Sequence, residues 1–388
     1  MNISKIHNCY GCGVCATICP HHIISIELNK EGFYEPYIKE KERCTDCGLC
    51  LSVCSYSDDK VADTHDDADY YAAWSNDSEV RRKCSSGGLG FEIGRHLIEQ
   101  GYKACGVRYN STTNRAEHYV AETVEEYLSS MGSKYIQSYT LPGFEKLNRK
   151  DNFLVTGTPC QIDSLRRYIR KLRIEDHFVL MDFFCHGVPS MFLWNQYLRE
   201  VEKQIGKASC ISWRNKQTGW HDSWNMCLGE ISENGEERFR YMSRWSKGDL
   251  FYHFFLGNYC LGKACYEKCK YKMASSAADI RIGDLWGTVY EKDQEGVSAV
   301  LALTEKGKAL VRELHNSCHF EQRSGDIVME GQMRVPPARP YIRKVIIRQL
   351  ANRMTLANIS VVTLRLYYMS FLPKRALKKL VKIVKWAK

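Results

Sequence analysis

The chain has 388 residues, of which 44% are hydrophobic, so it is long enough for more than one globular domain. Its 18 cysteines are far more than an ordinary globular protein carries. The length excludes a small disulfide scaffold, and residues 1–11 have neither an apolar segment nor a cleavage-site pattern. We therefore expect a cytoplasmic protein whose cysteines hold metal as thiolates.

The net charge of +10 is unevenly distributed along the chain. Residues 331–388 contain 14 Lys and Arg and no Asp or Glu. Residues 1–330 hold 41 basic against 45 acidic side chains and are therefore mildly acidic. This asymmetry predicts an acidic partner or an anionic membrane surface for the basic tail, and not for the body.

Two cysteine motifs near the N-terminus repeat the spacing C-x2-C-x2-C-x3-C. This spacing is typical of bacterial two-cluster ferredoxins, in which the fourth cysteine of each motif ligates the other 4Fe–4S cluster. The first cluster is then assigned to Cys9, Cys12, Cys15 and Cys54, and the second to Cys44, Cys47, Cys50 and Cys19. The alternative is a zinc site or a disulfide knot, which the duplicated motif disfavours. Ser55 stands where a second proline is common.

These motifs place a ferredoxin-like module over residues 1–57. Between them, residues 23–28 alternate like a strand, and residues 32–36 indicate a turn. Residues 58–69 are rich in aspartate and poor in large apolar side chains, so we interpret them as an acidic, solvated linker.

From residue 70 onward, strand-like and helix-like segments alternate. Strands are expected at 71–74, 104–109, 152–156, 178–184 and 279–284, and helices at 88–100, 161–172 and 191–204. This alternation predicts an α/β core over residues 70–330 with a mixed, partly parallel sheet. With the ferredoxin-like module in front and a basic, largely helical tail over 331–388, the fold class of the whole chain is α+β.

Four cysteines of the core form a candidate third cluster site. Cys160 and Cys185 each follow an expected strand, and ligands collect at the carboxyl ends of parallel strands. Cys265 and Cys269 lie about one helical turn apart further along. Cys260 is a rival ligand, and the alternative to a cluster is that some of these are buried structural cysteines.

Two further segments suggest a flavin or a nucleotide. Residues 85–88 (Ser-Ser-Gly-Gly) lie at the start of an expected helix, so their amides and hydroxyls could hold a phosphate. The alternative is an ordinary capped helix start, which has the same sequence pattern. Lys134 could stabilise a reduced, anionic flavin, with a surface lysine as the alternative.

Together these loops resemble the beta subunits of coenzyme F420 hydrogenase and dehydrogenase. The resemblance covers residues 70 to about 325 and rests on the segments 85–88, 132–135, 157–161, 185–190, 214–216, 219–220 and 278–287. Proteins of this kind with a ferredoxin module in front occur among bacterial polysaccharide-biosynthesis genes. One departure is that the family usually has C-x2-C late in the core, whereas three residues separate Cys265 and Cys269 here.

The resemblance implies FAD in the core with a 4Fe–4S cluster beside it. The expected cofactor-binding residues are Ser85, Ser86, Gly87, Gly88, Lys134, Gly157, Thr158, Pro159 and Gln161, and the expected core cluster ligands are Cys160, Cys185, Cys265 and Cys269. Lys134 is then also a candidate catalytic residue, because it would stabilise charge near the flavin. His186 is a candidate proton donor, since histidine titrates near neutral pH, with a structural loop histidine as the alternative.

These features predict an iron–sulfur flavoprotein oxidoreductase. Electrons would pass from a ferredoxin-like donor through the clusters to FAD and on to an organic substrate, such as a sugar or a lipid-linked intermediate of polysaccharide biosynthesis. The alternatives are a non-catalytic electron-transfer subunit of a larger dehydrogenase or hydrogenase, and an F420-dependent oxidoreductase.

The end of the basic tail has the pattern of an interfacial helix. Within residues 374–388 apolar side chains share one helical face and lysines flank it, which favours an anionic membrane surface such as the inner face of the plasma membrane. A helix packed on the body or a frayed terminus is the alternative. Residues 356–372 are interrupted by polar residues, so no spanning helix is expected, and no nucleic-acid-binding pattern is present.

Overall fold

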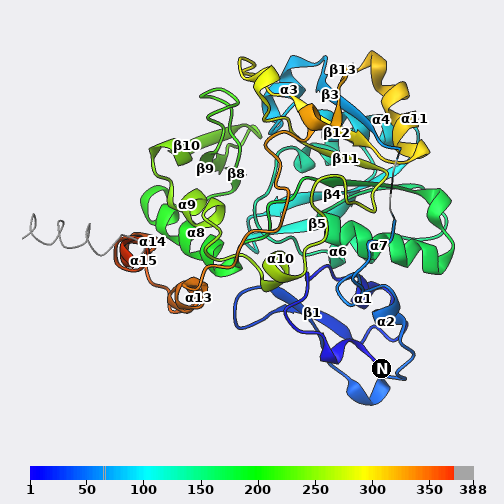
Figure 1. Ribbon diagram of the computed structural model, residues 1–388, viewed down its shortest axis with the longest axis horizontal. Helices are drawn as coiled ribbons and strands as arrows, with labels where there is room; N and C mark the ends of the chain where they lie inside the picture. The colour runs from blue at the N-terminus through cyan, green and yellow to red at the C-terminus, as the bar shows by residue number, and fades with distance from the viewer. Residues whose placement is uncertain (64, 66, 371–388) are drawn as a thin grey trace, which may run out of the picture.

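A computed structural model describes residues 1–370 apart from positions 64 and 66. The N-terminal module, blue in Figure 1, lies below a large core, and the last described helices lie at one side of that core. The fold class expected from the sequence, an α+β chain with a ferredoxin-like module in front of a mixed α/β core, is confirmed.

The N-terminal module is a small two-stranded sheet with two one-turn helices. Its elements are α1 (Val14–Thr17), β1 (Ile24–Leu28), β2 (Tyr34–Ile38) and α2 (Leu49–Ser52). Gly13 and Gly48 precede the two helices with φ of 76° and 73°. A residue with a Cβ would be strained at these φ values, so glycine allows each cysteine loop to turn directly into its helix. The expected turn at 32–36 is shorter in the structure, because Tyr34 and Pro36 already pair with β1.

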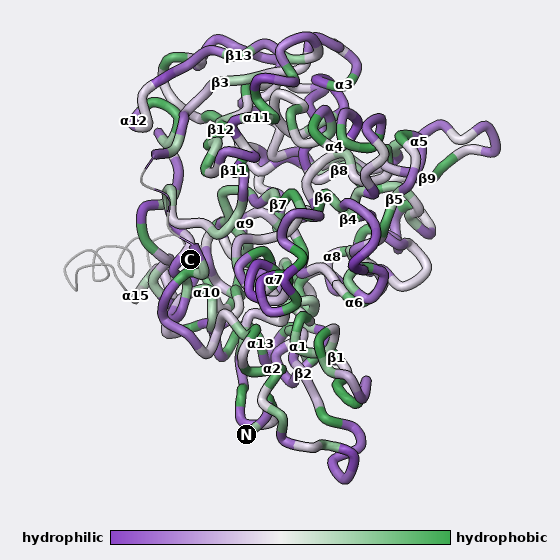
Figure 2. Tube along the Cα trace, turned by 90° about the vertical axis from the view of Figure 1, so that its right-hand side faces the viewer, coloured by the Kyte–Doolittle hydropathy of each residue, from purple (hydrophilic) through white to green (hydrophobic). Residues whose placement is uncertain are grey.

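The core is built on a mixed sheet that has eight strands in the described part of the chain. In spatial order they are β13 (Cys318–Gln322), β3 (Asp69–Ser75), β12 (Ser298–Ala302), β11 (Ile280–Asp284), β7 (Phe178–Phe183), β6 (Phe153–Thr156), β4 (Lys103–Asn110) and β5 (Arg115–Ala121). The neighbours β11, β7, β6 and β4 are parallel, whereas β12, β3, β13 and β5 each join antiparallel to a neighbour. The edge strand β13 is mostly hydrophilic, as Figure 2 shows.

Helices cover both faces of this sheet. They are α3 (Ser78–Lys83), α4 (Leu89–Glu99), α5 (Val124–Tyr127), α6 (Leu141–Phe144), α7 (Pro159–Leu172), α11 (Glu305–Glu313) and α12 (Gly325–Val328). Successive residues of a strand face opposite sides of the sheet, so Phe153 and Val155 pack with α7, while Leu154 between them packs with α4. The central strands are apolar on both faces because both faces are covered.

A second lobe packs beside the sheet around its own apolar core. It contains β8 (Cys210–Ser212), β9 (Asn225–Ile231), β10 (Glu237–Arg244), α8 (Met191–Ile205), α9 (Leu250–Leu256), α10 (Lys263–Glu267), α13 (Arg343–Ala351), α14 (Leu356–Asn358), the π-helix η8 (Ile359–Leu364) and α15 (Arg365–Ser370). Ile346, Ile347, Leu350 and Leu356 are buried in this core, so much of the described part of the basic tail packs on the body. Residues 374–388 lie outside the described residues. Among the helices that the structure describes, none is long and apolar enough to cross a membrane.

The acidic segment between the two modules is held on α7. Asp58 pairs with Arg167 at 2.7 Å, Asp63 pairs with Arg170 at 2.7 Å, and the Ala62 N–H donates to the carboxylate of Asp163 at 2.9 Å. The structure thus differs from the solvated linker expected at 58–69. Asp58 and Asp63 find basic partners on a helix that the sequence pattern could not place beside them.

Buried His118 on β5 predicts a pH dependence of stability. Its Nε2 lies 3.0 Å from the Thr156 carbonyl oxygen, and burial lowers its pKa from 6.5 to about 4. Between these values the unfolded chain binds a proton that the folded chain does not, so stability falls as the pH drops from 6.5 to 4 and is unaffected above 6.5. The full loss is about 3 kcal/mol.

Urea unfolding between about pH 4 and pH 7 would measure this contribution. The variant His118→Gln keeps an N–H donor and lacks the titrating ring. We expect its stability to fall less on acidification, and an identical pH profile in both proteins would contradict the assignment.

Candidate functional site

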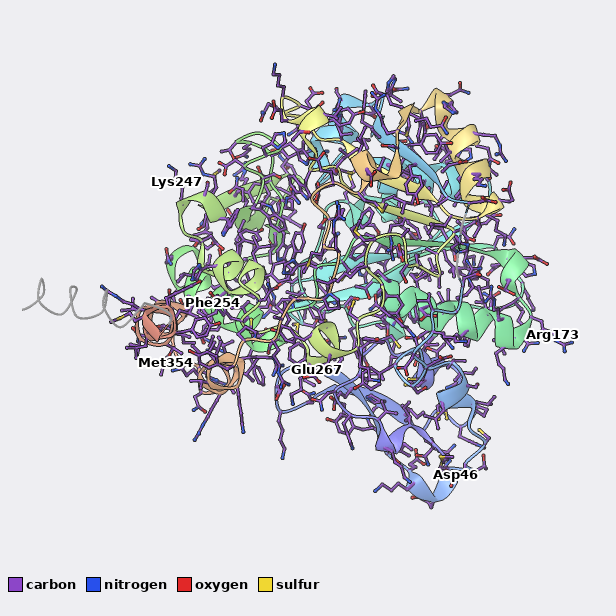
Figure 3. All side chains as sticks on the ribbon, viewed as in Figure 1. Asp46, Arg173, Lys247, Phe254, Glu267 and Met354 are labelled. Atoms are coloured by element: carbon purple, nitrogen blue, oxygen red, sulfur yellow. The ribbon has the colours of Figure 1, made fainter. Side chains whose placement is uncertain are left out.

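The four cysteines assigned to the second ferredoxin cluster surround one hollow. Cys19, Cys44, Cys47 and Cys50 all line it, together with Pro20 and Gly48. The fourth cysteine of the first motif therefore sits with the first three of the second motif, as the crossed ligand pattern requires. Cys47 is exposed, and its neighbour Asp46 lies at the tip of the module far from the core (Figure 3).

The cysteines assigned to the first ferredoxin cluster also lie close together. Burial raises the pKa of Cys12 to about 11, and nearby Cys54 adds to this effect. Burial raises the pKa of Cys15 as well, with further contributions from Cys12, Cys9 and Cys54. The raised pKa values of Cys12 and Cys15 fit a site in which bound iron compensates the charge of the thiolates.

In the described part of the chain, no three potential ligands are gathered tightly enough to hold a single metal ion. A cubane needs a wider arrangement, since each of its thiolates binds a different iron atom.

The structure also brings the four predicted core cysteines together. Cys160 and Cys269 border the same small apolar group around Tyr10 of the N-terminal module. A Cβ on Gly187 would lie 3.6 Å from the sulfur of Cys265, so the loop that follows Cys185 contacts Cys265. Burial raises the pKa of Cys185 to about 12, and both Cys265 and Cys269 raise it further.

Cys260 belongs to a different environment. It is completely buried in the apolar core of the second lobe, and its carbonyl oxygen accepts a hydrogen bond from the Ser190 N–H. Burial raises its pKa to about 12, and the main charged neighbour is Arg343 and not another cysteine. The geometry therefore favours Cys265 and Cys269 over Cys260 as ligands, despite the longer spacing of the pair.

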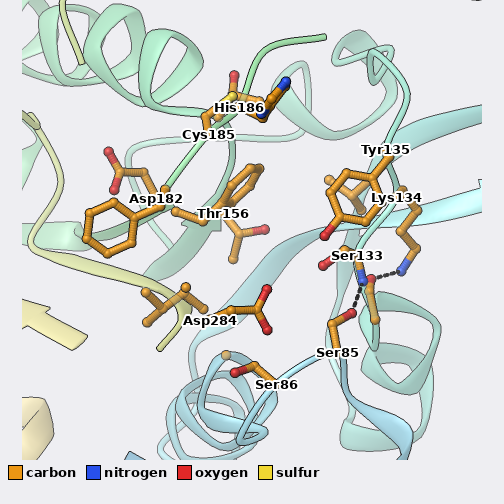
Figure 4. Close-up of a pocket in the computed structure, with 18 of the residues that line it drawn as sticks. Ser85, Ser86, Ser133, Lys134, Tyr135, Thr156, Asp182, Cys185, His186 and Asp284 are labelled. Atoms are coloured by element: carbon orange, nitrogen blue, oxygen red, sulfur yellow. Dashed lines mark hydrogen bonds between the residues drawn. The ribbon is translucent and has the colours of Figure 1, made fainter. Parts of the chain in front are cut away.

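Next to the core cysteines lies a cavity of about 430 Å³ (Figure 4). It opens where β6, β7 and β11 end, which is the edge of the sheet at which the sequence placed ligands. Cys185 lines it on one side and the loop of Ser85 and Ser86 on another. Aromatic side chains make much of the remaining wall: Tyr135, Phe183, Phe184, Trp224, Phe255 and Trp286.

The Ser85–Gly88 loop reaches this cavity mainly through its backbone. Ser85 Oγ accepts a hydrogen bond from the Ser133 N–H at 2.8 Å, and Ser86 Oγ donates to the Val297 carbonyl at 2.7 Å, so the Ser86 hydrogen is used within the fold. The N-cap of helix α4 is Gly88, which has φ of 91° and no side chain to cap the helix. Gly88 and the first residues of α4 line the cavity, whereas Gly87 packs beneath it, its N–H donating to Ser298 Oγ at 3.1 Å.

Lys134 lines the cavity, but its ammonium group turns back to its own loop. Nζ donates to the carbonyl oxygens of Ser129, Met131 and Gly132 at 3.1, 2.8 and 3.1 Å. Burial lowers the pKa of this lysine to about 7, while the three carbonyls favour its charged form. The contacts indicate a side chain that shapes the loop.

His186 lines the cavity and is held by a hydrogen bond. Its Nε2 lies 2.7 Å from Asn258 Oδ1, and burial lowers its pKa, so the ring is neutral at pH 7. Such a ring accepts a proton more readily than it supplies one at neutral pH.

The segment after β6 contributes to the wall and to helix capping. Gly157, Thr158 and Gln161 line the cavity, and Pro159 is the first residue of α7. The amide of Gln161 accepts from the Thr158 N–H at 2.9 Å and donates to Ser138 Oγ at 3.0 Å. Thr158 and Gln161 thus form a capping box, which leaves little of the Gln161 amide for a ligand.

Reasoning from the sequence gave no role to a buried arginine beside the cavity. Arg214 donates to Asp284 at 2.8 Å and to the Tyr135 hydroxyl at 3.2 Å. Its guanidinium also lies 4.6 Å from the ring of Trp224 and 4.9 Å from that of Trp286. Arg214 and Asp284 belong to the motifs 214–216 and 278–287, but nothing in these motifs shows that the two residues lie close together.

Models of two protein families match this chain. The family described as coenzyme F420 hydrogenase/dehydrogenase, beta subunit, matches with its N-terminal part over residues 70–143 and its C-terminal part over 150–326, and a 4Fe-4S dicluster domain matches residues 8–57. No curated protein matches. Among solved structures, a chain from the F420-reducing [NiFe] hydrogenase complex of Methanosarcina barkeri is similar, with 17% identity and a TM-score of 0.46, over 74% of this chain and 89% of that chain. The chain is an iron–sulfur protein and belongs to the coenzyme F420 hydrogenase/dehydrogenase beta subunit family, with a 4Fe–4S dicluster domain at its N-terminus.

Proposed function

We propose that this protein is an iron–sulfur flavoprotein oxidoreductase. Electrons from a ferredoxin-like donor would enter through the exposed second ferredoxin cluster and pass by the first cluster and a core cluster to FAD and an organic substrate. The observation that carries this proposal is the position of the cavity, which touches Cys185 on one side and the start of α4 on the other. FAD, when bound, supplies a carrier that exchanges one electron with clusters and two with a substrate.

The cavity wall provides distinct surfaces for the parts of such a cofactor. The uncapped start of α4 at Gly88 presents backbone N–H groups and the positive end of the helix dipole, which suits a diphosphate. The rings of Tyr135 and Trp286 suit a planar heterocycle. We propose that Lys134 keeps the loop between these two surfaces in shape.

We propose Tyr135 and His186 as the residues that handle protons. The Tyr135 oxygen accepts from Arg214, and burial raises its pKa, so the hydroxyl keeps its own hydrogen for a ligand in the cavity. Neutral His186 is suited to take up a proton. In this assignment Tyr135 replaces His186 as the preferred donor.

The experiment is anaerobic purification of the full chain, followed by a flavin spectrum and turnover assays with chemically reduced ferredoxin. Sugar nucleotides, lipid-linked sugars and F420 would be offered as substrates. We expect bound flavin and turnover of one class, with Tyr135→Phe retaining flavin and losing most of the turnover. Clusters without flavin, and no turnover, would overturn the oxidoreductase assignment.

A second candidate is a non-catalytic electron-transfer subunit. The match to the beta subunits of hydrogenases and dehydrogenases favours it, since a beta subunit acts together with other subunits. In that case the isolated chain would exchange electrons with dyes, and substrate turnover would require a partner protein.

We also propose that the C-terminal helices dock on an anionic membrane, where a lipid-linked substrate would be found. Val361, Val362 and Leu366 are 61, 55 and 61% exposed, and Arg365 beside them is exposed too. Residues 374–388, for which the sequence predicts the same property, follow directly.

Co-sedimentation of the full chain with vesicles, neutral or anionic, tests this docking. We expect binding to anionic vesicles that falls severalfold in the double variant Val362→Glu/Leu366→Glu. Val289→Glu is a matched control, since Val289 is 52% exposed in a different part of the molecule. Equal binding by all three proteins would contradict a docking face on these helices.

A further inference from the structure

Two buried serines join the ferredoxin module to the core. Ser55 follows the last cysteine of the second motif, and Ser164 lies on α7 one turn after Cys160; both are 0% exposed. The Ser55 N–H donates to Ser164 Oγ at 3.2 Å, and the two hydroxyl oxygens are 2.7 Å apart. A proline at position 55 would lack both the N–H and the hydroxyl. The departure from the usual ferredoxin motif therefore creates this contact.

The serine pair connects the two proposed cluster sites. At one end, Ser164 Oγ lies 3.3 Å from the sulfur of Cys12, a proposed ligand of the first ferredoxin cluster. At the other end, Ser55 Oγ donates to the carbonyl oxygen of Cys160, a proposed core ligand, at 3.2 Å. A continuous line of polar contacts thus runs from Cys12 to Cys160 through otherwise buried surroundings.

Among the possible arrangements of the hydroxyl hydrogens, two keep a hydrogen bond across the 2.7 Å contact between the serines. Each hydroxyl has one hydrogen to donate, and an iron-bound Cys12 sulfur can only accept. In the first state Ser164 donates to Ser55, and Ser55 donates to the Cys160 carbonyl. In the second state Ser55 donates to Ser164, and Ser164 donates to the Cys12 sulfur. Both states keep the bond from the Ser55 N–H, and they exclude each other.

We propose that Ser55 and Ser164 form a redox-responsive hydrogen-bond switch that sets the potential of the cluster held by Cys12. The proposal rests on the ligand assignment made under the proposed function. One electron from a ferredoxin-like donor makes the cluster sulfurs more negative, so reduction favours the state in which Ser164 donates to Cys12. Oxidation favours the opposite state. The two hydroxyl hydrogens rotate, and no proton enters or leaves.

The switch predicts opposite shifts for two variants that each remove one hydroxyl. Ser164→Ala removes the donor to Cys12 and is expected to lower the midpoint potential, with on the order of tenfold less reduced cluster at the original midpoint. Ser55→Ala removes the competing partner, so Ser164 donates to Cys12 in both redox states. The oxidised state then loses the stabilisation that it gained from the Cys160 carbonyl, and the midpoint potential is expected to rise.

Redox titration of the anaerobically purified full chain, followed by electron paramagnetic resonance, measures both shifts. Ser57→Ala is the matched control, because its exposed hydroxyl donates to the Cys54 carbonyl at 2.9 Å and not to a sulfur. We expect no shift for this variant. Shifts of Ser164→Ala and Ser55→Ala in the same direction, or no shift in either, would overturn the switch.

These measurements distinguish failure of the switch from failure of the proposed function. Absence of any 4Fe–4S signal in the unaltered chain would overturn the ligand assignment. Normal signals without opposite shifts would overturn the switch alone, whether or not flavin is bound. If Ser164→Ala does not retain iron, the midpoint potentials of Ser55→Ala and Ser57→Ala are compared instead. A higher potential in Ser55→Ala alone supports the switch, because damage to a site does not predict a higher potential.

Discussion

The variant Cys265→Ala is expected to lose a whole cluster while both ferredoxin clusters stay in place. With three clusters the unaltered chain holds about twelve iron atoms, and the variant should hold about eight. The reason is geometric, because Cys265 lies against the loop of Cys185 and shares a buried site with Cys269. Iron and acid-labile sulfide analysis of the anaerobically purified protein gives the count.

The natural control is Cys260→Ala. Cys260 is a buried cysteine five residues away whose side chain packs in the second lobe. We expect full iron content in this variant. If Cys260→Ala loses four iron atoms and Cys265→Ala does not, the ligand set is wrong at that position. About eight iron atoms in the unaltered chain would remove the core cluster altogether.

The second large effect concerns stability. Arg281 and Asp182 form a completely buried ion pair in which Nε and an Nη donate to the two carboxylate oxygens at 2.7 and 2.6 Å. The other Nη donates to the carbonyls of Tyr271 and Met273, which belong to a loop that lines the cavity. Arg281→Met leaves the Asp182 carboxylate buried without its partner, so we expect the free energy of unfolding to fall by about 3–5 kcal/mol.

Urea unfolding followed by circular dichroism measures this loss, and Arg240→Met provides the comparison. Arg240 pairs with Glu230 at 2.5 Å, but its side chain is 56% exposed, and such surface pairs contribute less than about 1 kcal/mol. A similar small effect in both variants would show that the buried pair is not a major source of stability.

Patterns of local origin were predictable from the sequence. The cysteine spacing of the front module reflects loops that turn at Gly13 and Gly48, so the motif alone carries most of its geometry. The central strands were predictable because burial on both faces makes them short apolar runs between turn residues. The sequence placed Cys160 and Cys185 after two expected strands, and the cavity opens at the end of the sheet where these parallel strands end.

Contacts between distant segments were not predictable in the same way. The sequence suggests Lys134 as a residue that stabilises charge near a flavin, but its loop folds so that three carbonyl oxygens converge on the ammonium group. Arg214 and Asp284 lie 70 residues apart, and neither has a local signal for the pair they form. Ser55 was noted only as a departure from a motif, although its partner on α7 explains it.

The salt bridges between the acidic segment and α7 have a consequence for how electrons travel. A module on a free tether delivers electrons by diffusing to its partner, and its rate then depends on solvent viscosity and on tether length. Here Asp58 and Asp63 are anchored on α7, the helix that carries Cys160 in its first turn. Electron tunnelling between the proposed clusters of the front module and the core would then take place across a fixed gap, so its rate would depend neither on solvent viscosity nor on tether length.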